Sequence, residues 1–217
     1  MSNVSVRAVG KSVRLSVGGR WVKEEHVEIS GKKAIVVGGA SGMGRASAEL
    51  LAARGAAVAI LDREGSDGED VAAAIGGYFF AVDVTDFTGT ETAIQSAVDG
   101  LGGLHVSVTT AGGGIGKRTL SKDGPHGLDE FRAVVDLNLI GTFNVSRLAA
   151  FHMANNEPED EERGVIVNTA SIAAFEGQIG QVAYSASKAA IAGMCLTMAR
   201  DLGSWGIRAL AIAPSCS

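Results

Sequence analysis

The stretch Lys32-Lys-Ala-Ile-Val-Val37-Gly38-Gly-Ala-Ser-Gly42-Met-Gly44-Arg45 decides the fold of this chain. Its first part is a short apolar run typical of a buried strand, its middle is a glycine-rich turn, and a helical pattern follows up to Arg54. A dinucleotide site requires this order, because glycines let a pyrophosphate approach the amides at a helix N-terminus. The spacing departs from the G-x-G-x-x-G fingerprint, and a glycine-rich loop without further context is a weak signal.

The next apolar run supplies that context. Ala57–Leu61 reads as a second strand and ends in Asp62, about 20 residues after the glycines, where a carboxylate can accept both ribose hydroxyls of NAD. The same carboxylate would repel a 2′-phosphate, whereas the adjoining Arg63 could accept the 2′-phosphate of NADP. No basic residue lies inside the glycine turn, so the sequence favours NAD. Taken alone, Asp62 would be an ordinary turn carboxylate.

The rest of the chain continues the alternation of strands and helices. Apolar runs predict further strands at Gly77–Val82, Leu104–Thr109, Val165–Asn168 and Ile207–Ala213. Alternation of this kind predicts an α/β fold, a Rossmann-like doubly wound parallel sheet with helices on both faces. The acidic segment Asn155–Arg163 and the glycine-rich segment Gly112–Gly127 read as loops.

Composition agrees with one α/β domain and excludes several classes of protein. Of 217 residues 46% are apolar, which suits buried parallel strands, and the net charge of -5 argues against a nucleic-acid partner. No apolar run approaches the length of a membrane span, so no membrane partner is expected. Two cysteines, Cys195 and Cys216, indicate a reducing compartment, and the four histidines lack ligand spacing, so no metal is expected.

The run from Ser171 to Lys188 carries groups suited to proton transfer. Tyr184 and Lys188 stand four apart in an Ala- and Ser-rich stretch, so they share one face of a helix. An ammonium beside a phenol favours the phenolate, which can exchange protons with an alcohol or a carbonyl. Ser171 follows the strand predicted at Val165–Asn168, at the edge where open α/β sheets bind ligands. The alternative is an ordinary exposed Tyr-Lys pair.

Together these residues resemble the short-chain dehydrogenase/reductase family, and the run from Leu128 onward resembles its 3-hydroxyacyl-CoA dehydrogenase type 2 members. The motif positions are Gly38, Gly42, Gly44, Asp83, Val84, Ala111, Gly112, Asn138, Ser171, Tyr184 and Lys188. The resemblance implies an NAD-dependent oxidoreductase that interconverts a secondary alcohol and a ketone, with a 3-hydroxyacyl-CoA or a hydroxysteroid as substrate. It also implies a homo-oligomer, at least a dimer and a tetramer at full length, built through the helices that hold Asn138 and Tyr184.

The resemblance also implies a role for each matching residue. Tyr184 would be the general acid/base, Lys188 would favour its phenolate and bind the nicotinamide ribose, Ser171 would hydrogen-bond the reacting oxygen, and Asn138 would hold a relay water. Gln178 would lie near the substrate. The cofactor would be held by Gly38, Ser41, Gly42, Met43, Gly44, Asp62, Asp83, Val84, Ala111, Gly112, Tyr184, Lys188 and Pro214. The alternative reading of Asn138 is a solvated or helix-kinking residue, and that of Asp83 a helix cap.

Three departures from the family pattern limit what can be carried over. Thr109-Thr110 stands where the family has an Asn-Asn pair, which puts a sheet-bracing hydrogen bond in doubt, and Val37 replaces the usual Thr. The sequence ends at Ser217, where the family continues into a substrate-covering segment and a final strand. The resemblance then implies an exposed sixth strand and an incomplete pocket wall, so cofactor binding is expected to survive better than turnover. The alternative function is a dinucleotide-binding, catalytically impaired subunit.

The N-terminal part differs from the family core, so we expect an extension over residues 1–30 and the NAD-binding domain over residues 31–217. The first 23 residues carry five basic and no acidic side chains, a bias seen in mitochondrial transit peptides. Alternating apolar residues such as Val13, Leu15 and Val17 favour a small hairpin. A cytoplasmic location is therefore expected, with the mitochondrial matrix as the alternative.

Overall fold

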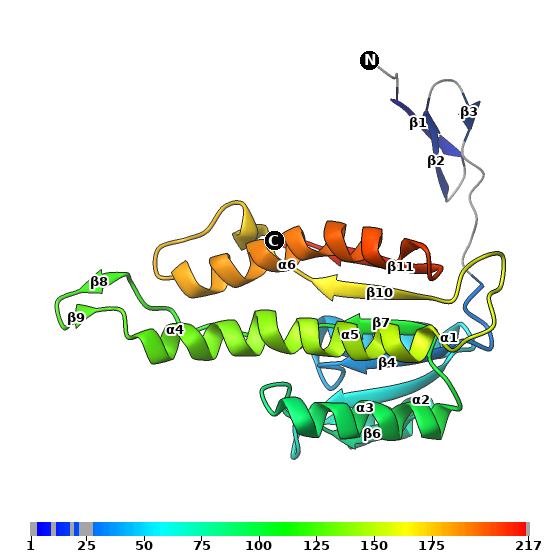
Figure 1. The fold of residues 1–217 in the computed structure, drawn as a ribbon, viewed down its shortest axis with the longest axis horizontal. Helices are drawn as coiled ribbons and strands as arrows, with labels where there is room; N and C mark the ends of the chain where they lie inside the picture. Colours follow the sequence, from blue (N-terminus) through cyan, green and yellow to red (C-terminus); the bar gives the residue numbers. More distant parts are fainter. Residues whose placement is uncertain (1–3, 10–11, 18–19, 22–27, 216–217) are drawn as a thin grey trace.

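The computed structural model describes residues 4–9, 12–17, 20–21 and 28–215. Its main sheet has six strands in the order β11-β10-β7-β4-β5-β6, and every neighbouring pair is parallel (Figure 1). The strands are β4 (Lys33–Val37), β5 (Ala57–Asp62), β6 (Tyr78–Ala81), β7 (Val106–Thr109), β10 (Gly164–Thr169) and β11 (Ile207–Ile212). The predicted Rossmann-like parallel sheet is confirmed.

Helices connect these strands and cover both faces of the sheet (Figure 1). They are α1 (Gly42–Ala53), α2 (Gly68–Ile75), α3 (Phe87–Leu101), α4 (Leu128–Val135), a π-helical turn (Asp136–Ile140), α5 (Gly141–Met153), a 3-10 turn (Ile172–Ala174) and α6 (Val182–Gly203). The expected loop between Gly112 and Gly127 contains a short hairpin, β8 (Leu120–Ser121) and β9 (Gly124–Pro125). Figure 1 shows this hairpin at the end of the molecule toward which the sheet strands point.

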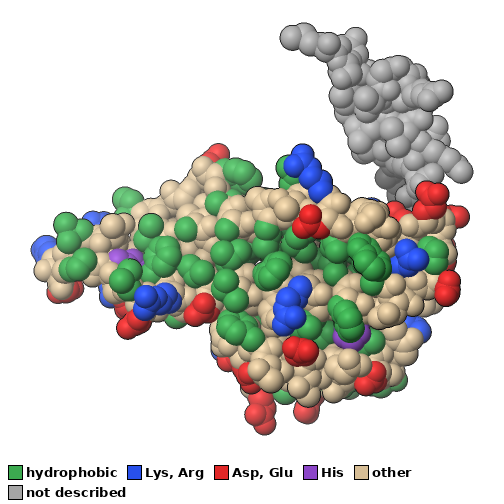
Figure 2. Space-filling model, viewed as in Figure 1, with side chains coloured by type: hydrophobic (Ala, Val, Ile, Leu, Met, Phe, Trp, Pro, Cys, Tyr) green, Lys and Arg blue, Asp and Glu red, His purple; other side chains and the backbone are tan. Residues whose placement is uncertain are grey.

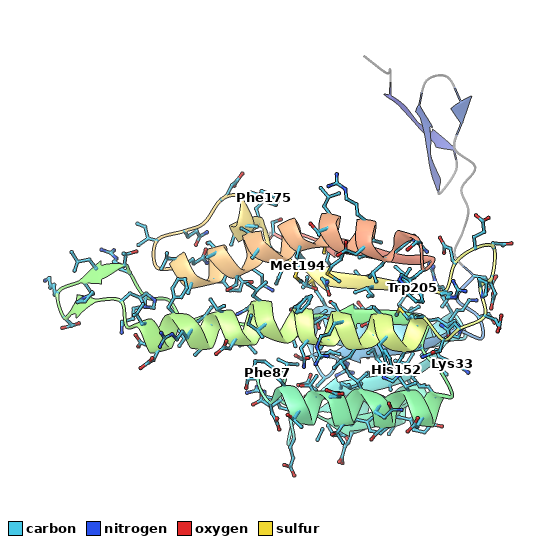
Figure 3. All side chains as sticks on the ribbon, viewed as in Figure 1. Lys33, Phe87, His152, Phe175, Met194 and Trp205 are labelled. Carbon is cyan, nitrogen blue, oxygen red and sulfur yellow. The ribbon has the colours of Figure 1, made fainter. Side chains whose placement is uncertain are left out.

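Strand alternation divides the interior into two cores. On β4, Ile35 and Val37 belong to a cluster that includes residues of α3, α5 and α6, with Met194 of α6 packed against it (Figure 3). Ala34 and Val36 belong to a second cluster with residues of α1 and α2. Successive side chains of a strand point to opposite faces, so a nearly continuous apolar strand can serve both cores.

Helix α6 corrects one expectation from the sequence. By length and composition alone α6 could cross a membrane, whereas no apolar run of that length was expected from the sequence. The core helix of a globular domain satisfies the same criteria, and α6 contacts β10 and β11 and buries Lys188. The sheet that it covers therefore accounts for part of its apolar surface, since 33% of its apolar 18-residue window is buried.

Strand β11 lies at one edge of the sheet, as the sequence led us to expect. Leu210 and Ile212 on this strand are 47% and 43% exposed. An unpaired edge displays free backbone donors and acceptors.

The N-terminal residues form a separate antiparallel sheet. Strand β1 (Val4–Val9) pairs with β2 (Ser12–Val17), and β2 pairs with β3 (Arg20–Trp21). Alternating apolar and polar residues favoured a hairpin over a helix at these positions. Residues 1–3, 10–11, 18–19, 22–27 and 216–217 lie outside the described part, so Cys216 is not placed. The domain boundary after residue 30 stays a prediction.

Candidate active site

A cavity of about 520 Å³ opens at the carboxyl ends of β4, β5 and β7. This is the edge at which doubly wound sheets bind ligands. Its lining includes seven of the predicted cofactor residues, namely Gly38, Ser41, Asp62, Asp83, Val84, Ala111 and Gly112. Arg63, whose charge could favour NADP, also lines it. We call it the cofactor cavity.

The glycine turn at its base has no room for side chains. A Cβ on Gly38 would lie 2.5 Å from the amide nitrogen of Ala111, and the φ of +86° at Gly38 also favours glycine. A Cβ on Gly44 would lie 2.1 Å from the carbonyl oxygen of Gly38. Gly44 therefore allows α1 to approach the turn, although Gly42, Met43 and Gly44 do not line the cavity.

The N-terminus of α1 is open to an anion. Ser41 is the N-cap residue, but its side chain makes no capping hydrogen bond, and the first turn of α1 has no acidic residue. Helix N-termini present unpaired N–H groups and a positive dipole end. The pyrophosphate of a dinucleotide suits this position.

Two carboxylates, those of Asp62 and Asp83, line the cofactor cavity. The Oδ2 of Asp62 accepts a hydrogen bond from the Ala40 amide at 2.9 Å, and its Oδ1 accepts one from the Arg63 amide at 2.8 Å. Asp62 therefore braces the glycine turn as well as facing the cavity. Asp83 accepts hydrogen bonds from the hydroxyl and the amide of Thr85, which hold the pKa of its carboxyl below the usual value.

Thr110 lines the cofactor cavity and belongs to the Thr-Thr pair for which the sequence put a sheet-bracing hydrogen bond in doubt. Its Oγ1 lies 3.0 Å from the carbonyl oxygen of Gly38 and 3.2 Å from that of Val37, so the hydroxyl donates to the glycine turn. The hydroxyl of Thr109 is buried and has no partner in the described part of the chain. The Thr-Thr pair therefore braces the turn through its second member. The sequence could have indicated this hydrogen bond, because the Thr110 hydroxyl stands where the family has an Asn amide that can also donate.

A second cavity of about 500 Å³ holds the predicted reaction residues. Ser171, Gln178, Tyr184 and Pro214 all line it, and Gly113 lines both this cavity and the cofactor cavity. Pro214, predicted as a cofactor residue, lies in this cavity, where its carbonyl accepts a hydrogen bond from the Ile172 amide at 3.0 Å. We call it the substrate cavity.

Lys188 is buried beside Tyr184. Only 3% of it is exposed, its Nζ donates to the Thr169 carbonyl at 2.7 Å, and Nζ lies 5.5 Å from the centroid of the Tyr184 ring. Burial disfavours the charged amine and lowers the pKa of Lys188 to about 8. A Cβ on Gly112 would lie 3.4 Å from Nζ, so the ammonium also borders the cofactor cavity.

Asn138 is fully buried in the π-helical turn between α4 and α5. Its Nδ2 donates to the carbonyls of Gly113 and Val134 at 2.6 and 2.8 Å, and its Oδ1 accepts from the Gly113 amide at 3.1 Å. The solvated alternative for Asn138 is therefore wrong. Its side chain holds the loop that separates the two cavities, while its role in a water relay stays a prediction.

Ser171 has its hydroxyl proton available. Its Oγ accepts a hydrogen bond from the Ala173 amide at 3.1 Å, as the N-cap of the 3-10 turn. A hydroxyl that accepts in this way can still donate to an oxygen in the cavity. The predicted position of Ser171 at the end of a strand is confirmed.

Gly114 is a residue that the sequence did not single out. A Cβ at this position would lie 3.1 Å from Cδ2 of Tyr184, so the glycine backbone lies against the phenol ring. The glycine-rich run after β7 could have indicated a close contact, but it did not identify the partner. Similarly, a main-chain acceptor such as the Thr169 carbonyl leaves no signal in the sequence.

Comparisons with known proteins agree with this geometry. The sequence model described as "short chain dehydrogenase" matches residues 32–217. The chain is 51% identical over 185 residues to 3-hydroxyacyl-CoA dehydrogenase type-2 of Drosophila melanogaster, covering 83% of this chain and 72% of the relative. It is 48% identical over 191 residues to the protein of that name from Homo sapiens, covering 86% and 73%.

A solved structure has the same arrangement. The crystal structure of 3-hydroxyacyl-CoA dehydrogenase type-2 from Mycobacterium avium superposes with a TM-score of 0.82 at 42% identity, covering 87% of this chain and 76% of that one. Ipsdienol dehydrogenase of Ips pini is a more distant relative, 33% identical over 196 residues.

Proposed function

Because the chain belongs to the short-chain dehydrogenase/reductase family and is an oxidoreductase acting on CH–OH groups, we propose that it interconverts a secondary alcohol and a ketone with NAD. One observation carries the proposal. The cavity that contains Tyr184, with Lys188 buried behind the ring, meets the cofactor cavity at Gly113. A proton-transfer group and a dinucleotide site are thus neighbours.

The residues of the substrate cavity divide the proton chemistry. A bound NAD would supply the acceptor for the hydride of the alcohol carbon. Tyr184 takes the hydroxyl proton, and the Lys188 ammonium, held by the Thr169 carbonyl, stabilises the phenolate. Ser171 donates a hydrogen bond to the reacting oxygen. In the reductive direction Tyr184 returns the proton to the carbonyl oxygen.

The preference for NAD rests on Asp62. Its carboxylate faces the cofactor cavity and is held in place by two backbone amides. A 2′-phosphate at this position would meet a like charge. Arg63 opposes this effect, and the fixed geometry of Asp62 favours NAD. Asp62→Asn should reduce the ratio of NADPH to NADH dissociation constants, as measured by fluorescence titration.

The substrate proposed is a 3-hydroxyacyl-CoA or a hydroxysteroid. Several relatives with 46–51% identity are named 3-hydroxyacyl-CoA dehydrogenase type-2, which supports the first class. A dinucleotide-binding subunit with little turnover is the second candidate. Within residues 28–215 two apolar residues of the substrate cavity wall, Ile115 and Ile172, are exposed, so the cavity is open to water. Water weakens the electrostatic interactions of the reacting groups, which favours the second candidate.

We also propose that the chain forms homo-oligomers through α5 and α6. Figure 2 shows apolar side chains gathered on the face made by α4, α5 and α6. Phe143 and Phe151 of α5 are 48% and 67% exposed, and Leu196 of α6 is 60% exposed. Exposed apolar area on this scale is typical of protein interfaces. Light scattering on a size-exclusion column would report a dimer or tetramer, whereas a monomer at micromolar concentration would contradict the proposal.

Tyr184→Phe tests the catalytic assignment, and Tyr78→Phe is its control. The chain has only these two tyrosines, and Tyr78 is an exposed residue of β6. Loss of a general acid/base should lower kcat by about 10²- to 10⁴-fold, with NADH binding unchanged. The assay is NADH oxidation with acetoacetyl-CoA and, separately, with a ketosteroid. Equal rates for the two variants would refute the assignment, and NADH binding without turnover by the wild type would select the second candidate.

A further inference from the structure

A third cavity adjoins the substrate cavity on the side away from the sheet strands. It has a volume of about 510 Å³ and shares Gln178 and Gln181 with the substrate cavity. It lies between the loop before β8 and the segment that leads into α6. A ligand whose carbonyl is at Tyr184 can therefore extend past the two glutamines into this space. We call it the outer cavity.

The outer cavity is positively charged in a chain of negative net charge. Lys117 and Arg118 line it, and none of its lining residues is acidic, while the whole chain has a net charge of -5. Lys117 is paired with Glu130, which lies outside the lining. Among the described residues no salt bridge or side-chain hydrogen bond involves Arg118. Its guanidinium is therefore free to bind an anion, for which its planar donors are well suited.

The backbone around Arg118 is held in place. The Lys117 amide donates to the Gly180 carbonyl at 2.9 Å, and the Thr119 carbonyl accepts from the His126 amide at the same distance. These bonds tie the loop to the entrance of α6 on one side and to the β8–β9 hairpin on the other. Figure 1 shows the hairpin and the loop before α6 at the same end of the molecule. The backbone of Arg118 therefore has a defined position beside the substrate cavity.

Three apolar side chains also line the outer cavity. Leu120 and Ile179 are 70% and 81% exposed and line the outer cavity with Val182. Such exposed apolar side chains next to a free guanidinium match a ligand that has both an apolar part and an anionic group.

We propose that the substrate carries an anionic group and that Arg118 binds it in the outer cavity while the carbonyl lies at Tyr184. This inference rests on the proposed function and names the charge of its substrate. The phosphates of an acyl-CoA satisfy it, as does a carboxylate that lies far from the ketone in the substrate. A neutral hydroxysteroid leaves Arg118 without a partner.

Arg118→Gln tests the proposal, with Lys122→Gln as the matched control. Lys122 is an exposed cation of the same loop that does not line the outer cavity. Three acetoacetyl thioesters separate the sources of charge: acetoacetyl-CoA carries phosphates, S-acetoacetylglutathione carries carboxylates far from the ketone, and acetoacetyl-N-acetylcysteamine carries no anion. Arg118→Gln should raise KM for an anionic ketone about tenfold, in keeping with the loss of a charge-assisted hydrogen bond. It should change kcat, and KM for the neutral thioester, by less than about twofold. Lys122→Gln should leave KM for all three ketones unchanged.

The outcomes distinguish this proposal from the function on which it rests. An effect on acetoacetyl-CoA alone identifies phosphate as the anion, and an effect on S-acetoacetylglutathione shows that a carboxylate also binds. Equal changes for all three ketones, or no change for either anionic ketone, overturn the proposal. Calorimetric titration with acetoacetyl-CoA provides a readout that does not need turnover. A wild type that oxidises no NADH but loses acetoacetyl-CoA affinity in Arg118→Gln would contradict the proposed function alone, and equal dissociation constants would overturn the role of Arg118.

Discussion

The buried amine of Lys188 should make the stability of the apo protein depend on pH in a direction that can be calculated. Burial lowers the pKa of Lys188 from 10.5 to about 8. Between these two pH values the unfolded chain binds a proton that the folded protein has lost, so the free energy of unfolding rises with pH. Below about pH 8 both states are protonated, and the full cost of the buried charge remains.

The size of the effect follows from the same shift. One pKa unit corresponds to about 1.4 kcal/mol, so the shift corresponds to about 3 kcal/mol, and about 2 to 3 kcal/mol of it develops between about pH 7 and about pH 10. Lys188→Met keeps the apolar stem and removes the titrating group. It also leaves the Thr169 carbonyl without its partner, but this cost does not vary with pH.

Urea denaturation of the wild type and Lys188→Met across this pH range is the assay. The wild type should gain about 2 to 3 kcal/mol relative to the variant as the pH rises, and subtraction removes the contributions of other titrating groups. Lys122→Met, at an exposed position, should run parallel to the wild type. A difference between wild type and Lys188→Met that stays constant within about 0.5 kcal/mol would refute the reasoning, because surface changes of that size need no buried charge.

Three further predictions concern the cofactor turn, the substrate cavity and the core. Thr110→Val removes the hydroxyl that donates to the glycine turn and should weaken NADH binding by about 0.5–1.5 kcal/mol in fluorescence titration; unchanged affinity would contradict its bracing role. Gly114→Ala places a Cβ 3.1 Å from the tyrosine ring and should lower kcat by about tenfold through misplacement of the phenol, whereas Gly116→Ala, with open space around it, should not; equal kinetics of the two variants would count against it. Met153→Ala empties a fully buried position and should cost about 2–5 kcal/mol in urea denaturation, while the same change at Met43, 47% exposed, should cost less than about 0.5 kcal/mol.

Local patterns predicted most of the sheet and the positions of the reaction residues. The opening stretch predicts a strand before the glycine turn, and the structure has it at Lys33–Val37, because an apolar run followed by glycines is a local signal. Strand ends were predicted less accurately. The strand predicted at Leu104–Thr109 begins at Val106 in β7, because pairing with the neighbouring strands decides where a strand starts. Tyr184 and Lys188 share a helix face because their spacing requires it.

By itself the sequence determined the α/β fold, the glycine turn, the acidic residue after β5 and the order of the reaction residues, because each depends on neighbours within one or two elements. Only the tertiary structure decided that the Lys188 amine meets the Thr169 carbonyl, that the Asn138 side chain holds the Gly113 loop, that Thr110 braces the glycine turn and that Arg118 faces a cavity next to Tyr184. These contacts join segments that are far apart in the chain and often use main-chain atoms. Sequence periodicity describes which face a residue occupies, whereas its partner across a cavity is set by how the layers pack.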